Sequence, residues 1–343
     1  MIAELELEQV VEETKGRSPG QDAWREFRRN KIAVAGAIFI IAIVVIALAA
    51  PIFTPYHYAF QNNLNNRAKP MEGYIVTTDK LPECHWANTP LEWGCTLFVF
   101  GSDSLGRDIW SRVVYGARVS LAVAIVASTV SLSIGIVYGT LSGYAGGVVD
   151  NIMMRIVDFM YAIPLLPIII LMTVYFKALA RANVTTGFSG FLIQLDRSAG
   201  GLLFVFIALG ALNWIGMARL ARGQVLSYKQ KEFVEAATAM GATNSRIIFK
   251  HLLPNIIGPL LIAESLAIPG YIFTEAALSF IGLGVNPPTP SWGAMINEGY
   301  AGIRSNPHLV LVPGMALVFT TLAFNFMGDG LRDAFDPRMR GKH

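Results

Sequence analysis

Charged residues are scarce in this chain of 343 residues. Asp, Glu, Lys and Arg make up 15% of it, whereas hydrophobic residues make up 53%. A soluble globular domain carries about a quarter charged residues. The deficit excludes an ordinary soluble protein and indicates a polytopic membrane protein.

The sequence also lacks the motifs of most catalytic and metal sites. It contains no Gly-x4-Gly-Lys-Ser/Thr loop for nucleotide phosphates, no His-Glu-x-x-His pair, no Gly-x-Ser-x-Gly turn and no dinucleotide-binding fingerprint. Two cysteines exclude a disulfide-rich scaffold, the five histidines show no ligand spacing, and no basic-aromatic patch suggests nucleic acid. We expect no catalysis, cofactor or metal in this chain, so energy for any uphill transport comes from a partner or from ion coupling.

Long apolar runs, each near the ~20 residues that cross a bilayer core, predict an all-α fold with six membrane spans. We place them at 32–51, 121–142, 159–178, 201–218, 256–284 and 309–326. Pro164 and Pro167 predict a kink in the third span, and the polar stretch 179–200 predicts a loop. Gly258-Pro259 and Pro269-Gly270 predict breaks in the fifth span.

The distribution of basic residues predicts the orientation. With six spans both termini lie on one side, together with the loops after the second and fourth spans. These segments hold 17 Lys and Arg residues against 9 in the other three loops. Because basic residues are retained on the cytoplasmic side, we expect both termini and the loop 220–255 to be cytoplasmic.

The loop 220–255 predicts two short helices joined by a tight corner. Ser227 with Gln230 resembles a capping box for the first helix, and Phe233, Ala236, Ala237 and Met240 recur on one helical face, with Glu235 opposite. Gly241 suits the left-handed residue that ends a helix, and Thr243 can cap the second helix. That helix is predicted to run to Pro254.

Two features of the spans predict internal contacts rather than contacts with lipid. Small residues at four-residue spacing form a ridge on the second span, which favours close packing of helix backbones: Ala127, Ser131, Gly135, Gly139 and Gly143. The fifth span carries Glu264 and Glu275, and charged groups at membrane depth mark either a translocation pathway or a buried structural contact. Both interpretations stay open for these two carboxylates.

The stretch between about 52 and 100 is polar and rich in proline, so it predicts a loop region outside the membrane. Cys84 and Cys95 lie in it, either as a disulfide or as two unpaired thiols. From Gly101 on, the sequence predicts a turn followed by an amphipathic helix. Its closely spaced charges favour a local salt-bridge network over direct contact with substrate: Asp103, Arg107, Asp108 and Arg112. Arg155 with Asp158 predicts a further ion pair.

The residues around the corner also carry a resemblance. Glu235-Ala236-Ala237, then Gly241, then Leu253-Pro254, resemble the coupling loop of permease subunits in ATP-binding-cassette importers, with His251 departing from the usual aliphatic residue. Three further stretches resemble the C-type permease of the dipeptide, oligopeptide and nickel branch: 101–121, 275–293 and 328–338.

This resemblance implies a six-helix importer permease (MetI-like) that translocates di- or oligopeptides across the cytoplasmic (inner) membrane of a prokaryote. Its implied partners are a homologous second permease, two cytoplasmic ATPase subunits that bind ATP and Mg, an extracytoplasmic binding protein and membrane lipid. The ATPase-coupling residues would be Glu235, Ala236, Ala237, Gly241, Leu253 and Pro254.

We therefore divide the chain into a cytoplasmic tail with an interfacial helix, a first span, an extracytoplasmic loop region, a permease core and a cytoplasmic C-terminal tail: 1–31, 32–51, 52–118, 119–328 and 329–343. Nickel chelates or oligosaccharides are alternative substrates. A transporter that uses Glu264 and Glu275 as proton sites, and a membrane-anchored scaffold, are alternatives of another class.

Overall fold

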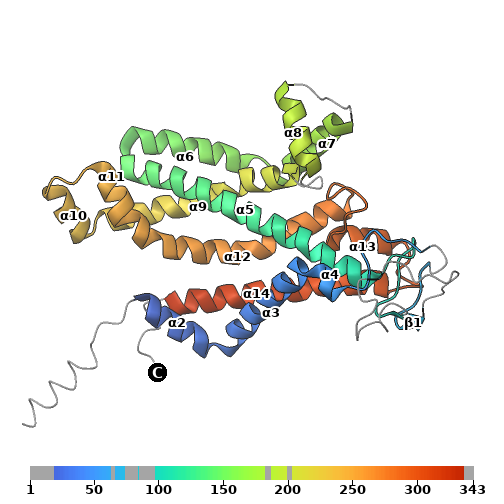
Figure 1. Ribbon diagram of the computed structural model, residues 1–343. Helices are drawn as coiled ribbons and strands as arrows, with labels where there is room; N and C mark the ends of the chain where they lie inside the picture. Colours follow the sequence, from blue (N-terminus) through green and yellow to red (C-terminus); the bar gives the residue numbers. More distant parts are fainter. Residues whose placement is uncertain are drawn as a thin grey trace, which may run out of the picture.

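A computed structural model describes residues 19–62, 66–73, 84, 97–181, 187–198 and 203–335. Within them the protein is a bundle of long helices (Figure 1). The helices are α2 (Pro19–Arg29), α3 (Lys31–Leu48), α4 (Ala50–Phe53), α5 (Ile109–Ala145), α6 (Gly147–Ala162), α7 (Leu165–Arg181), α8 (Gly187–Ser198), α9 (Leu203–Lys229), α10 (Glu232–Ala239), α11 (Asn244–Arg246), the π-helical η3 (Ile247–Leu252), α12 (Leu253–Phe280), α13 (Trp292–Tyr300) and α14 (His308–Phe335). A short ladder pairs β1 (Glu72–Gly73) with β2 (Leu97–Phe98) in antiparallel register.

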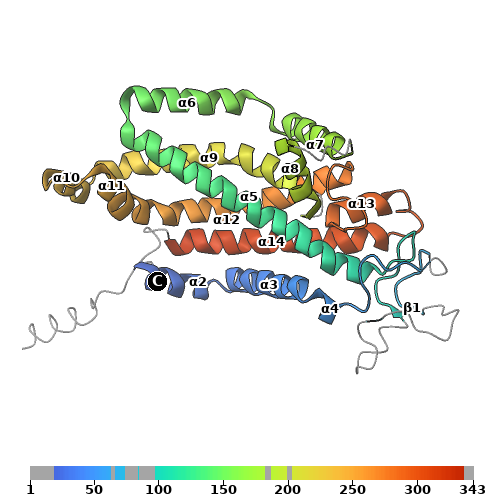
Figure 2. The ribbon, with the colours of Figure 1, turned by 45° about the horizontal axis from the view of Figure 1, so that its top comes forward.

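The bundle has two distinct ends (Figures 1 and 2). One end carries α10, α11 and α2, and the last turn of α14 packs there against α2 through Phe27 and Ala334. We call it the α10 end. The opposite end carries the β1–β2 ladder and α13, and we call it the β1 end. The long helix α5 crosses the bundle between the two ends and contacts α3, α9, α12 and α14.

Four helical stretches among the described residues are long and apolar enough to cross a membrane: α3, α5, the continuous stretch Asn244–Phe280, and α14. The pair α6 and α7, bent by 81°, would add a fifth. The predicted span 201–218 corresponds to the first part of α9, which is outside this set. The multispan helical fold is therefore present, and the count of six stays a prediction.

Helices extend into stretches that the division of the chain places in a loop region or a tail, and the division itself stays a prediction. The helix α5 begins at Ile109, within the stretch 52–118, because Asp108 caps it by accepting the Ser111 N–H at 2.7 Å. The stretch 179–200 is not a continuous loop, since it contains α8. The last helix runs on to Phe335, into the stretch 329–343 assigned to a tail, because Ala334 is buried against α2.

The predicted kink and the predicted breaks have different outcomes. The bend between α6 and α7 falls at Pro164, whose predecessor Ile163 is extended (φ −83°, ψ 128°), as the residue before a proline favours. In contrast, α12 is one unbroken helix with Pro259 and Pro269 inside it. Each proline removes one N–H donor, and packing against neighbouring helices holds the rest of the ladder.

The predicted ridge lies along the contact between α5 and α9. All five ridge residues are buried. A Cβ at Gly139 would lie 2.3 Å from the Ala218 carbonyl oxygen and 2.7 Å from the Ala221 Cβ, and one at Gly135 would lie 2.5 Å from the Met217 side chain. The absence of side chains at these glycines lets the two backbones approach closely. Close approach stabilises helix pairs in a membrane, where burying apolar groups gives no advantage over lipid.

We predict that Gly139→Ala destabilises the bundle by about 1–3 kcal/mol, the usual cost of overpacking a tight contact. Thermal unfolding of the purified protein in detergent measures this. Gly223→Ala is the matched control, because Gly223 is on the exposed side of α9 and a Cβ there meets nothing. An equal loss of stability in both variants would show that the ridge is not a close contact.

Candidate functional sites

The helix α10 projects from the bundle and carries the predicted coupling residues (Figure 1). Val234 and Ala237 are each 3% exposed and pack inward, Val234 in a cluster that includes Val225 of α9 and Ile247 and Leu252 of η3. Phe233, Ala236 and Met240 remain on the surface, with Met240 83% exposed. The predicted common face is thus divided: Ala237 holds the helix in place, while the other three form an exposed apolar stripe, which we call the α10 stripe.

The predicted capping box is wrong. Ser227 lies inside α9, which continues to Lys229, and the residue at the N-cap of α10 is Lys231, with no side-chain cap. The reason is tertiary packing, because Val225 of the same turns is fully buried in the cluster beneath α10. Glu232 and Glu235 in the first turn of α10 still favour its start electrostatically. Glu235 is exposed, as predicted from its position opposite the apolar residues.

The corner after α10 has the predicted geometry. Gly241 has φ +80°, a left-handed conformation that L side chains rarely adopt. The Ala242 N–H donates to the Ala237 carbonyl at 3.1 Å and the Gly241 N–H donates to the Thr238 carbonyl at 2.9 Å, which is the Schellman pattern. Thr243 then caps the next helix by accepting the Arg246 N–H at 3.4 Å.

The second helix of the corner does not end at Pro254 as predicted. It passes through α11 and η3 directly into α12, with Leu253 and Pro254 in the first turn of α12. Leu253 is half-buried against the cluster beneath α10, and Pro254 is exposed. The Leu253 N–H donates to the Ile248 carbonyl, five residues back, and Pro254 itself has no N–H to donate. Since α11, η3 and α12 follow one another without a gap, the corner is joined to the membrane bundle by continuous helix.

Two buried carboxylates lie further along α12. Glu264 is 3% exposed and accepts hydrogen bonds from the Tyr271 hydroxyl at 2.8 Å and the Ser131 hydroxyl at 3.3 Å. Glu275 is 1% exposed and accepts from Ser120 at 2.8 Å and Ser279 at 2.6 Å. In both cases one donor comes from α5, so the two carboxylates tie α12 to α5.

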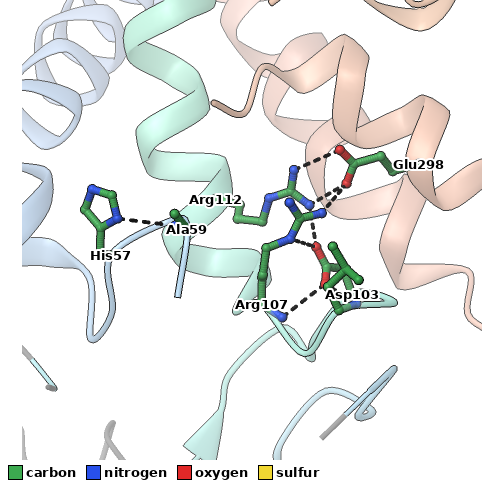
Figure 3. Close-up of polar contacts among 7 residues, drawn as sticks. His57, Ala59, Asp103, Arg107, Arg112 and Glu298 are labelled. Atoms are coloured by element: carbon green, nitrogen blue, oxygen red, sulfur yellow. Dashed lines mark hydrogen bonds and ion pairs between the residues drawn. The ribbon is translucent and has the colours of Figure 1, made fainter. Parts of the chain in front are cut away.

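At the β1 end a buried charge network joins α13 to the start of α5 (Figure 3). The Arg107 Nε donates to Asp103 at 2.6 Å, its terminal nitrogen donates to Glu298 at 2.7 Å, and Arg112 donates to both carboxylates. Arg112 is 2% exposed. The predicted network is thus correct for Asp103, Arg107 and Arg112. Sequence reasoning missed Glu298, which lies 186 residues from Arg112 and has no local signal.

Asp108 and Asp158 have partners other than those predicted. Asp108 bonds the Ser111 N–H and hydroxyl instead of an arginine. Asp158 pairs with Arg219 of α9 at 2.7 Å instead of with Arg155. Nearby, Arg222 of α9 makes a two-pronged pair with Asp150 of α6 at 2.6 and 2.5 Å. These pairs fix α6 to the part of α9 that leads into α10.

Cys84 is disulfide-bonded, and Cys95 lies outside the described residues. Among the residues that the structure describes, no group of three His, Cys, Asp or Glu side chains is placed to hold a metal ion.

Long apolar helices, a projecting helix pair at one end and buried carboxylates within the bundle define a polytopic membrane transport component. Residues 135–341 match the family model described as "Binding-protein-dependent transport system inner membrane component", and residues 18–70 match "N-terminal TM domain of oligopeptide transport permease C". The chain belongs to this family of inner membrane permease components.

Curated relatives match almost the whole chain. It is 39% identical to the oligopeptide transport system permease protein OppC of Haemophilus influenzae over 99% of this chain and 93% of that protein. It is 37% identical to the dipeptide transport system permease protein DppC of Bacillus subtilis over 93% and 86%. It is 34% identical to the glutathione transport system permease protein GsiD of Pectobacterium atrosepticum over 96% and 95%.

We predict a pH dependence that comes from Asp108. Burial raises the pKa of this carboxyl from 3.8 to about 6, although hydrogen bonds from Ser111 oppose the shift. The folded state therefore holds the proton more tightly than the unfolded state, and stability falls as pH rises from about 4 to about 6, by up to about 3 kcal/mol. In Asp108→Asn the side chain is neutral and still an N-cap residue.

Thermal unfolding of both proteins between pH 4 and 7 measures this effect. The stability of the wild type relative to Asp108→Asn should decline through that window. A difference that does not change with pH would contradict the prediction.

Proposed function

We propose that this chain is the permease subunit of an ATP-driven importer that moves short peptides across the cytoplasmic membrane. Its membership in a binding-protein-dependent transport family supports the transport role. The relatives reported above are named for oligopeptides, dipeptides and glutathione, all of which are short peptides. This common chemistry favours a peptide substrate over nickel chelates or oligosaccharides.

The observation that carries the proposal is the α10 stripe at the tip of the bundle. Phe233 is 42% exposed and Met240 83% exposed, and the exposed Ala236 between them leaves room for another backbone. The ring of Phe233 lies against His251 of η3, with centroids 6.5 Å apart. An apolar anchor on a rigid, projecting helix pair suits docking in a groove of a partner. We propose that this partner is an ATPase subunit and that it contacts Glu235, Ala236 and Gly241.

The proposed assembly contains a homologous second permease, two ATPase subunits that bind ATP and Mg, and an extracytoplasmic binding protein. This chain itself is non-catalytic. Both termini and the α10 end face the cytoplasm, which agrees with the excess of basic residues in those segments. The disulfide-bonded Cys84 supports an oxidising, extracytoplasmic location for the β1 end. Cys95 is the proposed partner of Cys84.

The test is uptake of a radiolabelled tripeptide, trialanine, by liposomes that contain the assembled complex. Uptake should require ATP inside the liposomes and binding protein outside. Uptake by this chain alone, abolished by an uncoupler and indifferent to ATP, would support the ion-coupled alternative instead. No uptake in any assembly would leave the scaffold alternative.

We predict that Gly241→Val uncouples the complex. The left-handed conformation costs an L residue about 1–2 kcal/mol, so the corner that orients the α10 stripe would distort, although no neighbouring atom obstructs a Cβ. Trialanine uptake should fall at least about fivefold, with normal membrane insertion. The control is Gly241→Asn, since asparagine tolerates this conformation, and it should retain uptake within about twofold. Equal uptake by both variants would contradict a role for the corner in coupling.

A further inference from the structure

A cavity of about 360 Å³ lies between α9 and α12, within the membrane bundle. Its polar lining comes from Asn213 of α9 and from Glu264, Tyr271 and Thr274 of α12. Gly216 and Gly270 also line it, both are exposed, and a Cβ at either would meet nothing within 4 Å. The absence of side chains at these two positions keeps one approach to Glu264 open.

The second feature is the surroundings of Glu264, which provide hydrogen-bond donors. Its hydrogen-bond partners are hydroxyl groups, those of Tyr271, Ser131 and Ser128. Among the ion pairs of the described residues, none involves Glu264. A buried charge normally has a counter-charge, and an ionisable group inside a membrane protein faces a partner or a pathway. The carboxylate therefore faces the cavity with hydroxyl partners and without a basic partner among the described residues.

We propose that Glu264 binds the free α-ammonium group of a peptide during its passage through the permease. The inference rests on the proposed function, because it needs a peptide in the pathway. An ammonium carries three donors, so it can bond a carboxylate oxygen and also the Asn213 carbonyl oxygen or the Thr274 hydroxyl. Tyr271 and Ser131 hold the carboxylate in place as positioning residues. A cavity of this size is at the small end for ligand sites, which suits the end of a peptide.

Glu275 provides the contrast. It lies on the same helix, is equally buried and also accepts from hydroxyl groups, those of Ser120, Ser279 and Ser291, yet it is not among the residues that line the cavity. We assign it a structural role, holding α12 against α5. Identical chemistry without the cavity makes it a matched control for Glu264.

The experiment measures uptake by liposomes that contain the complete complex with Glu264→Gln, Glu264→Asp or Glu275→Gln. The substrates are trialanine and N-acetyl-trialanine, the second supplied at a concentration that gives the wild type measurable uptake. All complexes use the same binding protein, so its own preference cancels when each variant is compared with the wild type for one substrate. Glutamine keeps the shape and acceptor oxygen of Glu264 but removes its charge.

Glu264→Gln should reduce trialanine uptake at least tenfold and N-acetyl-trialanine uptake less than twofold, with its melting temperature unchanged. Glu264→Asp should recover part of the trialanine uptake, and Glu275→Gln should affect both substrates equally. The inference is overturned if Glu264→Gln affects both peptides equally, affects neither, or loses uptake together with thermal stability. Failure of the wild-type complex to import trialanine with ATP would overturn the proposed function itself, a separate result.

Discussion

The close contact between α5 and α9 is the constraint on which the rest of the bundle depends. In a bilayer, apolar side chains gain little from leaving lipid, so helices associate through close backbone approach and polar contacts. The ridge from Ala127 to Gly143 supplies the first, since a Cβ at Gly139 would overlap the α9 backbone. The ion pair between Asp150 of α6 and Arg222 of α9 supplies a polar contact next to the ridge. Together they fix the part of α9 from which α10 projects.

The same helix α5 also determines where α12 lies. Ser120 bonds Glu275 and Ser131 bonds Glu264, so the two contacts are separated by eleven residues on each of two antiparallel helices. Three helical turns of the one therefore match three turns of the other, and a shift of α12 by one turn would break both contacts. Ser131 belongs to the ridge as well, four residues before Gly135, which packs against Met217 of α9. The contact that holds Glu264 therefore lies next to the contact between α5 and α9.

What the sequence reveals follows the range of each interaction. The apolar runs, the left-handed Gly241 and the Thr243 cap depend on neighbouring residues, so they could be predicted, and so could the ridge, whose spacing is a property of one helix. The predicted capping box at Ser227 is wrong because Val225 is buried, so that α9 continues past Ser227 in spite of the local capping signal. Pro259 and Pro269 suggested breaks that packing prevents. Glu298 could not be found, because its arginines lie in another part of the chain.

Coupling and substrate contact, as proposed, lie on one helix. Leu253 packs in the cluster beneath α10, and Glu264 follows eleven residues later, about 16 Å along the axis at 1.5 Å per residue. No loop intervenes, so a displacement of the α10 corner reaches the carboxylate through continuous helix. Pro259 lies between the two and leaves the helix one hydrogen bond short there. A movement of α12 relative to α9, as a rod or by bending at Pro259, would change the distance between Glu264 and Asn213 across the cavity. A displacement of α10 would then change how Glu264 binds an ammonium group, and no further moving element would be needed.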